Sequence, residues 1–355
     1  MPKKNTNLWH AKTWKNDEFY TQLPDIEKEL RHYKEHFKWK TVLCNCDDPR
    51  VSNFFHYFAY NFEQLGLKRL ITTCYKNQNP NLFSMNESEK AVYLIYDWDK
   101  NWNNIPDIEE IGIHELKWDW DFRSDECIEL LKQADIIVTN PPFSLFREYI
   151  TQLIKYDKKF LILSNMNAIT YKEVFPLIKD NKIWTWYGFN MSMVYKTTYP
   201  NLLEANRKFV IWKWYNPDDW YVKVPAICWF TNLDIKKRHE DLIMYKKYNA
   251  DEYPKYGNYD AIEVSMVNDI PYDYDGVMWV PITFLDKYNP EQFELLWRDG
   301  DLDLSVTYDF FTPPSEDLCN KYRRANNTWR VQNAYIVNNG VAKTSYKRLF
   351  IRRKK

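Results

Sequence analysis

The chain has 355 residues, of which 45% are hydrophobic, 28% are charged and 18% are aromatic. This length excludes a single small module and fits one large domain or two ordinary ones, and the composition excludes a disordered chain. The 49 basic and 49 acidic side chains cancel, so no global charge draws the protein to nucleic acid or to a membrane. An anion-binding face must therefore arise where charges segregate.

Five short apolar runs follow one another in the first half of the chain, and each ends in polar or aromatic residues. They are TVLCN at 41–45, LITTCY at 70–75, AVYLIY at 91–96, ADIIVTN at 134–140 and KFLILSN at 159–165. Amphipathic stretches lie between them: residues 24–37 place Ile26, Leu30, Tyr33 and Phe37 at helical spacing, and residues 124–133 begin with Ser124, a residue suited to cap a helix. This alternation predicts an α/β fold whose mostly parallel sheet is covered by helices.

The pattern changes near residue 235, where we predict a boundary between a first region, 1–235, and a second region, 236–355. Beyond this point the chain is charged and rich in tyrosine, and the regular alternation of strands and helices is lost. Charge also segregates here, because residues 251–275 are mostly acidic in charge whereas the tail from residue 321 contains Lys and Arg but no Asp or Glu. The tail is therefore a candidate anion-binding face.

The cysteines and the amino terminus predict a cytoplasmic protein with reduced thiols. The six cysteines are scattered, the amino-terminal residues contain no apolar stretch of the kind found in signal peptides, and no window approaches the roughly 18 apolar residues of a membrane span. Cys44 with Cys46, or His32 with His36, would supply half of a zinc site, but no second ligand pair stands out. We expect buried thiols, ordinary surface histidines and no metal.

The motif Asn140, Pro141, Pro142, Phe143 ends the fourth apolar run. In open α/β sheets ligands bind beyond the carboxyl ends of the strands, which is where this motif falls. Two prolines hold a rigid turn and present carbonyl oxygens without N–H groups, and Asn140 adds a side-chain oxygen. Such a cluster of acceptors suits an exocyclic amino group, and Phe143 can stack on the base that carries it. The alternative interpretation is a tight proline loop with a purely structural role.

Several segments in fixed order resemble the EcoRI-type adenine-specific DNA methyltransferases, which depend on S-adenosylmethionine. They are NDEFYTQ, YKEHF, CNCDDPRVSNFF, DFRSDECIELLKQADIIVTNPPFSLFREYI, FLDKYNPEQFE and the closing YKRLFIRRK. The resemblance runs from about residue 16 to the carboxyl terminus and is weakest around residues 190–270. It implies a Rossmann-like class I methyltransferase domain over 1–235 and a target-recognition, DNA-binding region over 236–355.

The resemblance also implies roles for individual residues. The cofactor-binding residues would be Phe19, Tyr20, Thr21, Asn45, Asp47, Pro49, Asp121 and Phe122, with Asp121 accepting from the adenine amino group of the cofactor and Phe122 packing on its ring. The segment CNCDDPR stands where the wider superfamily has a glycine-rich loop, but it contains no glycine. A solvated turn remains the alternative interpretation of Asp47 and Asp48. The usual acidic residue for the ribose is missing after the second strand. Asn140, Pro141, Pro142 and Phe143 would bind the target amino group and base.

The implied substrate is an adenine flipped out of double-stranded DNA, in a GAATTC-like site. The implied DNA contacts are Arg147, Arg323, Arg324 and Arg348, although an ordinary ion pair for Arg147 and a solvated tail remain alternatives. A restriction endonuclease would be a functional partner without a stable complex. Two further alternatives stay open: an amino methyltransferase acting on RNA or on a protein glutamine, and an inactive DNA-binding homologue.

Overall fold

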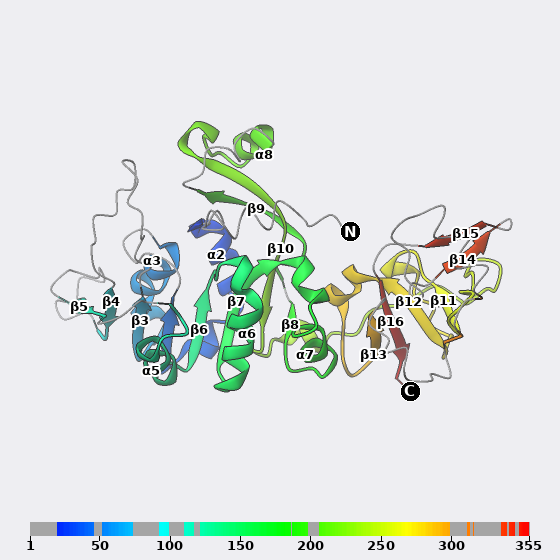
Figure 1. Ribbon diagram of the computed structural model, residues 1–355, viewed down its shortest axis with the longest axis horizontal. Coiled ribbons are helices and arrows are strands. Elements are labelled where there is room, and N and C mark those ends of the chain that lie inside the picture. The colour runs from blue at the N-terminus through cyan, green and yellow to red at the C-terminus, as the bar shows by residue number, and fades with distance from the viewer. Residues whose placement is uncertain are drawn as a thin grey trace. The chain divides into compact units, whose positions relative to one another are not determined.

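A computed structural model describes residues 20–45, 52–73, 92–98, 110–116, 121–185, 187–197, 206–298, 311–312, 315, 335–338, 341–344 and 348–354. The chain divides into two compact units, the first made of residues 1–174 and 183–233 and the second of residues 175–182 and 234–355 (Figure 1). The assignment of a function to each region stays a prediction. No helix in the described part of the chain is long and apolar enough to cross a membrane.

The first unit is built on a 10-stranded sheet whose centre is parallel (Figure 1). The parallel strands are β3 (Arg69–Thr73), β2 (Thr41–Cys44), β6 (Ile136–Thr139) and β7 (Lys159–Asn165), in that spatial order. Every residue of β2 and β6 is buried, as expected for β-branched and aliphatic strands covered on both faces. The predicted strands at 41–45, 134–140 and 159–165 are confirmed within a residue or two.

The sheet as a whole is mixed rather than mostly parallel, so this part of the predicted fold is corrected. Antiparallel strands flank the centre on both sides: β4 (Val92–Tyr96) and β5 (Gly112–Glu115) on one, and β10 (Tyr221–Thr231), β9 (Met191–Lys196), β8 (Trp184–Thr185) and β1 (Tyr20–Thr21) on the other. An apolar run shows that a strand is buried but not in which direction it runs. The run at 91–96 forms a strand as predicted, but β4 runs antiparallel to β3 rather than parallel to it.

The helices of the first unit include α2 (Leu23–Leu30), α3 (Asn53–Tyr60), α4 (Phe62–Leu65), α5 (Asp125–Gln133), α6 (Phe146–Lys155) and α8 (Arg207–Trp212), with 3₁₀ turns η1 (Lys34–Phe37), η2 (Phe143–Leu145), η3 (Met166–Thr170) and η6 (Pro217–Asp219). Ser124 caps α5 as predicted, because its hydroxyl accepts from the Cys127 amide at 3.3 Å. The helix predicted over 24–37 ends at Leu30, and its last residues form η1 instead.

The second unit contains a four-stranded sheet in the order β11 (Ala261–Glu263), β12 (Val277–Pro281), β16 (Arg348–Arg353) and β13 (Phe293–Arg298). It also contains α7 (Phe175–Lys179), the turns η7 (Lys236–His239), η8 (Val267–Asp269) and η9 (Ile282–Lys287), and the pair β14 (Tyr335–Asn338) and β15 (Val341–Thr344). Strand β16 lies between β12 and β13 although it closes the chain. The carboxyl-terminal segment is therefore part of this unit's core.

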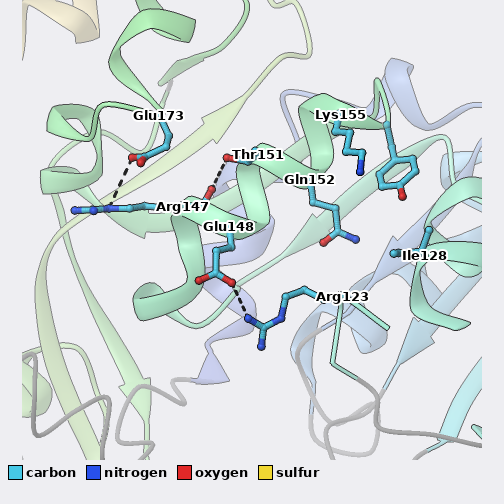
Figure 2. A pocket seen from close by; sticks show the side chains of 9 residues that line it. Arg123, Ile128, Arg147, Glu148, Thr151, Gln152, Lys155 and Glu173 are labelled. Atoms are coloured by element: carbon cyan, nitrogen blue, oxygen red, sulfur yellow. Dashed lines mark hydrogen bonds and ion pairs between the residues drawn. The ribbon is translucent and has the colours of Figure 1, made fainter. Parts of the chain in front are cut away.

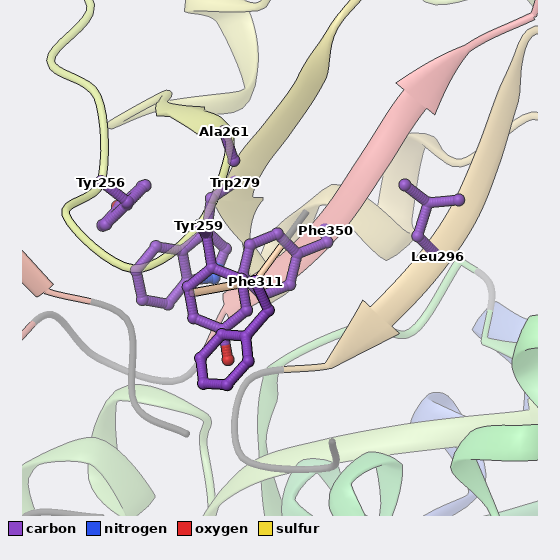
Figure 3. Packing of buried hydrophobic residues seen from close by; sticks show 7 residues of the cluster. All are labelled: Tyr256, Tyr259, Ala261, Trp279, Leu296, Phe311 and Phe350. Atoms are coloured by element: carbon purple, nitrogen blue, oxygen red, sulfur yellow. The ribbon is translucent and has the colours of Figure 1, made fainter. Parts of the chain in front are cut away.

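Aromatic side chains form one face of that core (Figure 3). Trp279 and Phe350 are cross-strand neighbours whose rings stack with centroids 5.3 Å apart and planes at 4°. The remaining members of the cluster are Tyr256, Tyr259, Ala261, Leu296 and Phe311. Stacked rings each bury a large apolar area and add a favourable contact of their own. Part of the high aromatic content thus serves packing.

Candidate active site

The Asn-Pro-Pro-Phe motif lies directly after β6, at the carboxyl edge of the parallel strands. Asn140 and Pro141 are buried, whereas Pro142 and Phe143 are partly exposed. The backbone turns at once into η2, where the carbonyl of Pro142 accepts from the Leu145 amide at 2.9 Å. The motif is therefore held between a buried strand on one side and a helical turn on the other, which keeps its carbonyl groups ordered.

Asn45 lies beside the motif because β2 and β6 are parallel neighbours. Val42 pairs with Ile136, so the ends of the two strands meet at the same edge of the sheet. The hydroxyl of Thr139, the last residue of β6, donates to the backbone carbonyl of Asn45. This bond is buried and joins the predicted cofactor loop to the predicted amino-group clamp.

Tyr149 connects Asn45 to Phe122. It lies one turn into α6, is buried, and donates from its hydroxyl to Oδ1 of Asn45. Its ring meets that of Phe122 edge to face, with centroids 5.0 Å apart and planes at 78°. A single side chain therefore sets the positions of two residues that the sequence predicts to bind cofactor.

Asp121 is an ionised acceptor held by Arg123. The carboxylate accepts from the backbone N of Arg123 at 2.9 Å and from its Nε at 2.8 Å, and Arg123 also donates to Glu148 at 2.6 Å. Burial raises the pKa of Asp121, but the hydrogen bonds from Arg123 and its positive charge outweigh burial and lower the pKa below the ordinary value. Gln152 of α6 donates to the carbonyl of Phe122 at 2.9 Å. Both predicted adenine-binding residues are thus fixed from α6.

Tyr20 and Thr21 form β1 and pair with Lys196 and Tyr195 of β9. The carbonyl of Thr21 accepts from the side-chain amide of Asn53 at 2.7 Å, which ties β1 to the first residue of α3. Helix α3 begins shortly after the segment at 46–51. Three further predicted cofactor residues, Phe19, Asp47 and Pro49, lie outside the described residues.

Arg147 packs against the Tyr171 ring and does not form a short ion pair with any described residue. Its guanidinium lies over the Tyr171 ring at 4.0 Å. Its Nε is 3.9 Å from the carboxylate of Glu173 (Figure 2). The side chain remains exposed beside an open hollow of about 440 Å³. The hollow is lined by Arg123, Ile128, Arg147, Glu148, Thr151, Gln152, Lys155, Tyr156 and Glu173. None of the four motif residues lines this hollow.

Arg348 is used inside the second unit. Its guanidinium donates to the Val264 carbonyl at 2.9 Å and lies 3.1 Å from the Glu263 carboxylate, and the side chains of this pair are only 13% and 15% exposed. We therefore leave Arg348 out of the DNA contacts proposed below. Arg323 and Arg324 lie outside the described residues.

Sequence reasoning missed Tyr149, Arg123 and Thr139. Tyr149 shares the helical spacing of Phe146, Ile150 and Leu153, which are all buried, so its polar role is hidden within an apolar stripe. Arg123 adjoins the predicted DF pair and could have been suspected from its position alone. Thr139 reads as an ordinary strand residue.

Comparisons with known proteins identify the family of the chain. The family model described as adenine-specific methyltransferase EcoRI matches residues 7–354. The chain is 51% identical over 322 residues to the type II methyltransferase M.EcoRI of Escherichia coli, an alignment that covers 86% of this chain and 94% of that protein.

Two further relatives come from mycoplasmas. The type II methyltransferases M.MgeORF184P of Mycoplasma genitalium and M.MpnI of Mycoplasma pneumoniae are both 39% identical, each over 81% of this chain and over 84% and 83% of their own lengths respectively. No solved structure matches the chain significantly. A family model that spans nearly the whole chain, together with relatives at this identity, shows that the chain belongs to the EcoRI family of adenine-specific methyltransferases.

Proposed function

We propose that the protein transfers a methyl group from S-adenosylmethionine to N6 of a flipped adenine in a specific site of double-stranded DNA. The observation that carries the proposal is the position of Asn140, Pro141, Pro142 and Phe143 at the carboxyl end of β6, beside Asn45 at the end of β2. The proposed amino-group clamp therefore lies next to predicted cofactor-binding residues.

The clamp would activate the target nitrogen by accepting hydrogen bonds from its two N–H groups. The lone pair of an adenine amino group is delocalised into the ring, so the nitrogen is a poor nucleophile. When the Asn140 side-chain oxygen and a proline carbonyl accept these two hydrogen bonds, the nitrogen is drawn toward a tetrahedral shape. Its lone pair is then localised on the nitrogen. Phe143 would pack on the base, and holding the reactants in line can supply on the order of 7–11 kcal/mol of the barrier.

The described residues fit the cofactor. Asp121 is an ionised acceptor suited to an exocyclic amino group, and the carboxylate retains lone pairs beyond those used by Arg123. Because Tyr149 holds Oδ1 of Asn45, the side chain of Asn45 has its N–H groups to donate. Tyr20 and Thr21 would approach the methionine part. When bound, S-adenosylmethionine supplies a methyl group on a positively charged sulfur.

The substrate would be duplex DNA. Flipping the adenine costs a few kcal/mol, which contacts to the distorted duplex must offset. Arg147, fixed on Tyr171 close to the end of β7, is one proposed contact, and Arg323 and Arg324 of the basic tail are others. The family membership favours a GAATTC-like site and a role as the modification partner of a restriction endonuclease that forms no stable complex with it.

The test is methylation of DNA that lacks N6-methyladenine by the purified protein and methyl-labelled S-adenosylmethionine, followed by single-molecule sequencing. We expect N6-methyladenine in one recurring sequence and no transfer by Asn140→Ala. Label found only in RNA or in protein would show that RNA or protein, rather than DNA, is the substrate. Tight cofactor binding without any transfer would show an inactive DNA-binding homologue instead.

A further inference from the structure

A long hairpin of β9 and β10 extends past the carboxyl edge of the parallel strands (Figure 1). Ile227 of β10 pairs with Asn165, the last residue of β7, so residues 221–226 run beyond the edge where the Asn-Pro-Pro-Phe motif lies. At about 3.3 Å per residue they extend on the order of 20 Å. We call the described residues 191–197 and 206–226 the arm.

The arm is anchored at its base and bent by an irregularity. The pairing of β9 with β10 shifts register between Val224 and Ile227, where Ala226 has a φ of 58°. Such bulges redirect a strand. Helix α8 packs against β10 and its Val210 is buried, and Arg207 donates to both oxygens of Asp218 at 2.7 and 2.8 Å. The end of the arm is therefore positioned by packing.

The end of the arm exposes large apolar side chains next to one another. Ile211, Trp212 and Trp214 are 56%, 68% and 96% exposed, and Lys213 between them is also exposed. Trp214 has a φ of 66°, a conformation that L-residues with bulky side chains rarely adopt. Among the described residues Phe209 and Lys213 flank the Trp212 ring on the arm itself, while the Trp214 side chain is almost fully exposed. A cluster of exposed tryptophans marks an interaction surface.

Cations interleave with the aromatic rings of the arm. Lys196 lies over Tyr221 at 5.9 Å, Lys213 over Trp212 at 5.3 Å and Lys223 over Phe209 at 4.5 Å. The arm carries the five cations Lys196, Arg207, Lys208, Lys213 and Lys223 against the two carboxylates Asp218 and Asp219. In a chain with no net charge this local excess of positive charge is complementary to a polyanion.

We propose that the end of the arm, through Trp212, Lys213 and Trp214, contacts the duplex DNA that flanks the target adenine. The inference rests on the proposed function and adds a DNA-contacting surface to it. Lysines would neutralise phosphates, while the exposed indoles pack on sugars or on bases unstacked by flipping. The arm reaches this position because β10 runs antiparallel to β7 and so projects on the same side as Asn140.

The test compares Trp212→Ala/Trp214→Ala with the control Trp39→Ala. Trp39 is 81% exposed but precedes β2, so it lies at the opposite, amino edge of the sheet. Binding of each protein to a short fluorescent duplex, which carries the recurring sequence found in the methylation assay, is measured by anisotropy in the presence of a non-reactive cofactor analogue. We expect the double variant to bind about tenfold more weakly or worse, and the control to bind like the wild type.

A second variant, Lys208→Gln/Lys213→Gln, tests the electrostatic part. The slope of log Kd against log salt concentration should fall by about one for each lysine that contacts a phosphate. Thermal unfolding and cofactor affinity should match the wild type in all variants, because the altered side chains are exposed. Unchanged DNA affinity in both arm variants would overturn the inference, provided that the wild type binds the duplex.

Two other outcomes distinguish a failure of the inference about the arm from a failure of the proposed function. Absence of duplex binding by the wild type would remove the proposed function itself, independently of the arm. If sedimentation shows a wild-type dimer that the tryptophan double variant dissociates, with DNA affinity unchanged, the surface pairs copies of the chain and the inference is wrong.

Discussion

The hydroxyl of Tyr149 donates to the side-chain oxygen of Asn45, a residue 104 positions earlier in the chain. Tyr149 follows the Asn-Pro-Pro-Phe motif on α6, and Asn45 follows β2, so the bond joins the helix after the proposed amino-group clamp to the proposed cofactor loop. The same ring packs against Phe122. We propose that Tyr149 positions Asn45 and Phe122 for cofactor binding.

Replacement of Tyr149 by Phe keeps the ring contact and removes the donor. A buried oxygen that loses its partner costs about 1–2 kcal/mol of unfolding free energy, and cofactor affinity should fall by about three- to tenfold. Urea denaturation and calorimetric titration with S-adenosylmethionine measure the two effects. Tyr156→Phe, at the end of the same helix, is the control. Unchanged cofactor affinity in Tyr149→Phe would show that the bond serves packing alone.

Replacement of Asn140 by Ala should strongly lower the rate of turnover while DNA and cofactor binding remain. The loss of one positioned polar group typically lowers kcat by about 10²–10³-fold. Single-turnover methylation measures the rate, and anisotropy and calorimetry measure the DNA and cofactor affinities. Asn167→Ala, an exposed asparagine after β7, serves as the control. An equal collapse of binding and turnover would contradict the role proposed for Asn140.

Replacement of Arg123 by Gln should make cofactor affinity depend on pH. In the wild type the pKa of Asp121 lies below its ordinary value, so the carboxylate stays ionised through the neutral and mildly acidic range. Without Arg123, burial alone raises the pKa of Asp121, and affinity should fall as the pH decreases toward that value.

The matched control for this prediction is Glu148→Gln. It removes the partner of Arg123 on α6 but leaves the contact between Arg123 and Asp121 in place. Its pH profile should therefore follow the wild type. Parallel profiles for Arg123→Gln and the wild type would exclude Asp121 as the titrating acceptor.

Replacement of Arg348 by Met should destabilise the second unit. It leaves the largely buried Glu263 carboxylate without its cation, and we expect a loss of about 2–4 kcal/mol of unfolding free energy. Arg352→Met removes the exposed pair with Glu294, in which the side chains are 48% and 45% exposed, and should cost at most about 1 kcal/mol. Urea denaturation measures the unfolding free energy of both variants. Equal stability of the two variants would show that the Arg348 pair is not structurally important.

Much of the candidate site could be predicted from the sequence. The β6 run, the polar residues that follow it and the two prolines each act through local physical chemistry: burial of aliphatic side chains, the end of a strand, and a backbone without donors. The order of the motifs along the chain was sufficient to identify the family that the comparisons show.

Other features were decided by the tertiary structure because they depend on partners distant in sequence. The direction of β4 and β10 follows from pairing with β3 and β7, which no apolar run encodes. Arg348 belongs to a basic tail in sequence, yet β16 inserts between β12 and β13 and carries this arginine to Glu263. Local sequence therefore establishes which groups are available for chemistry, whereas long-range packing establishes which of them meet.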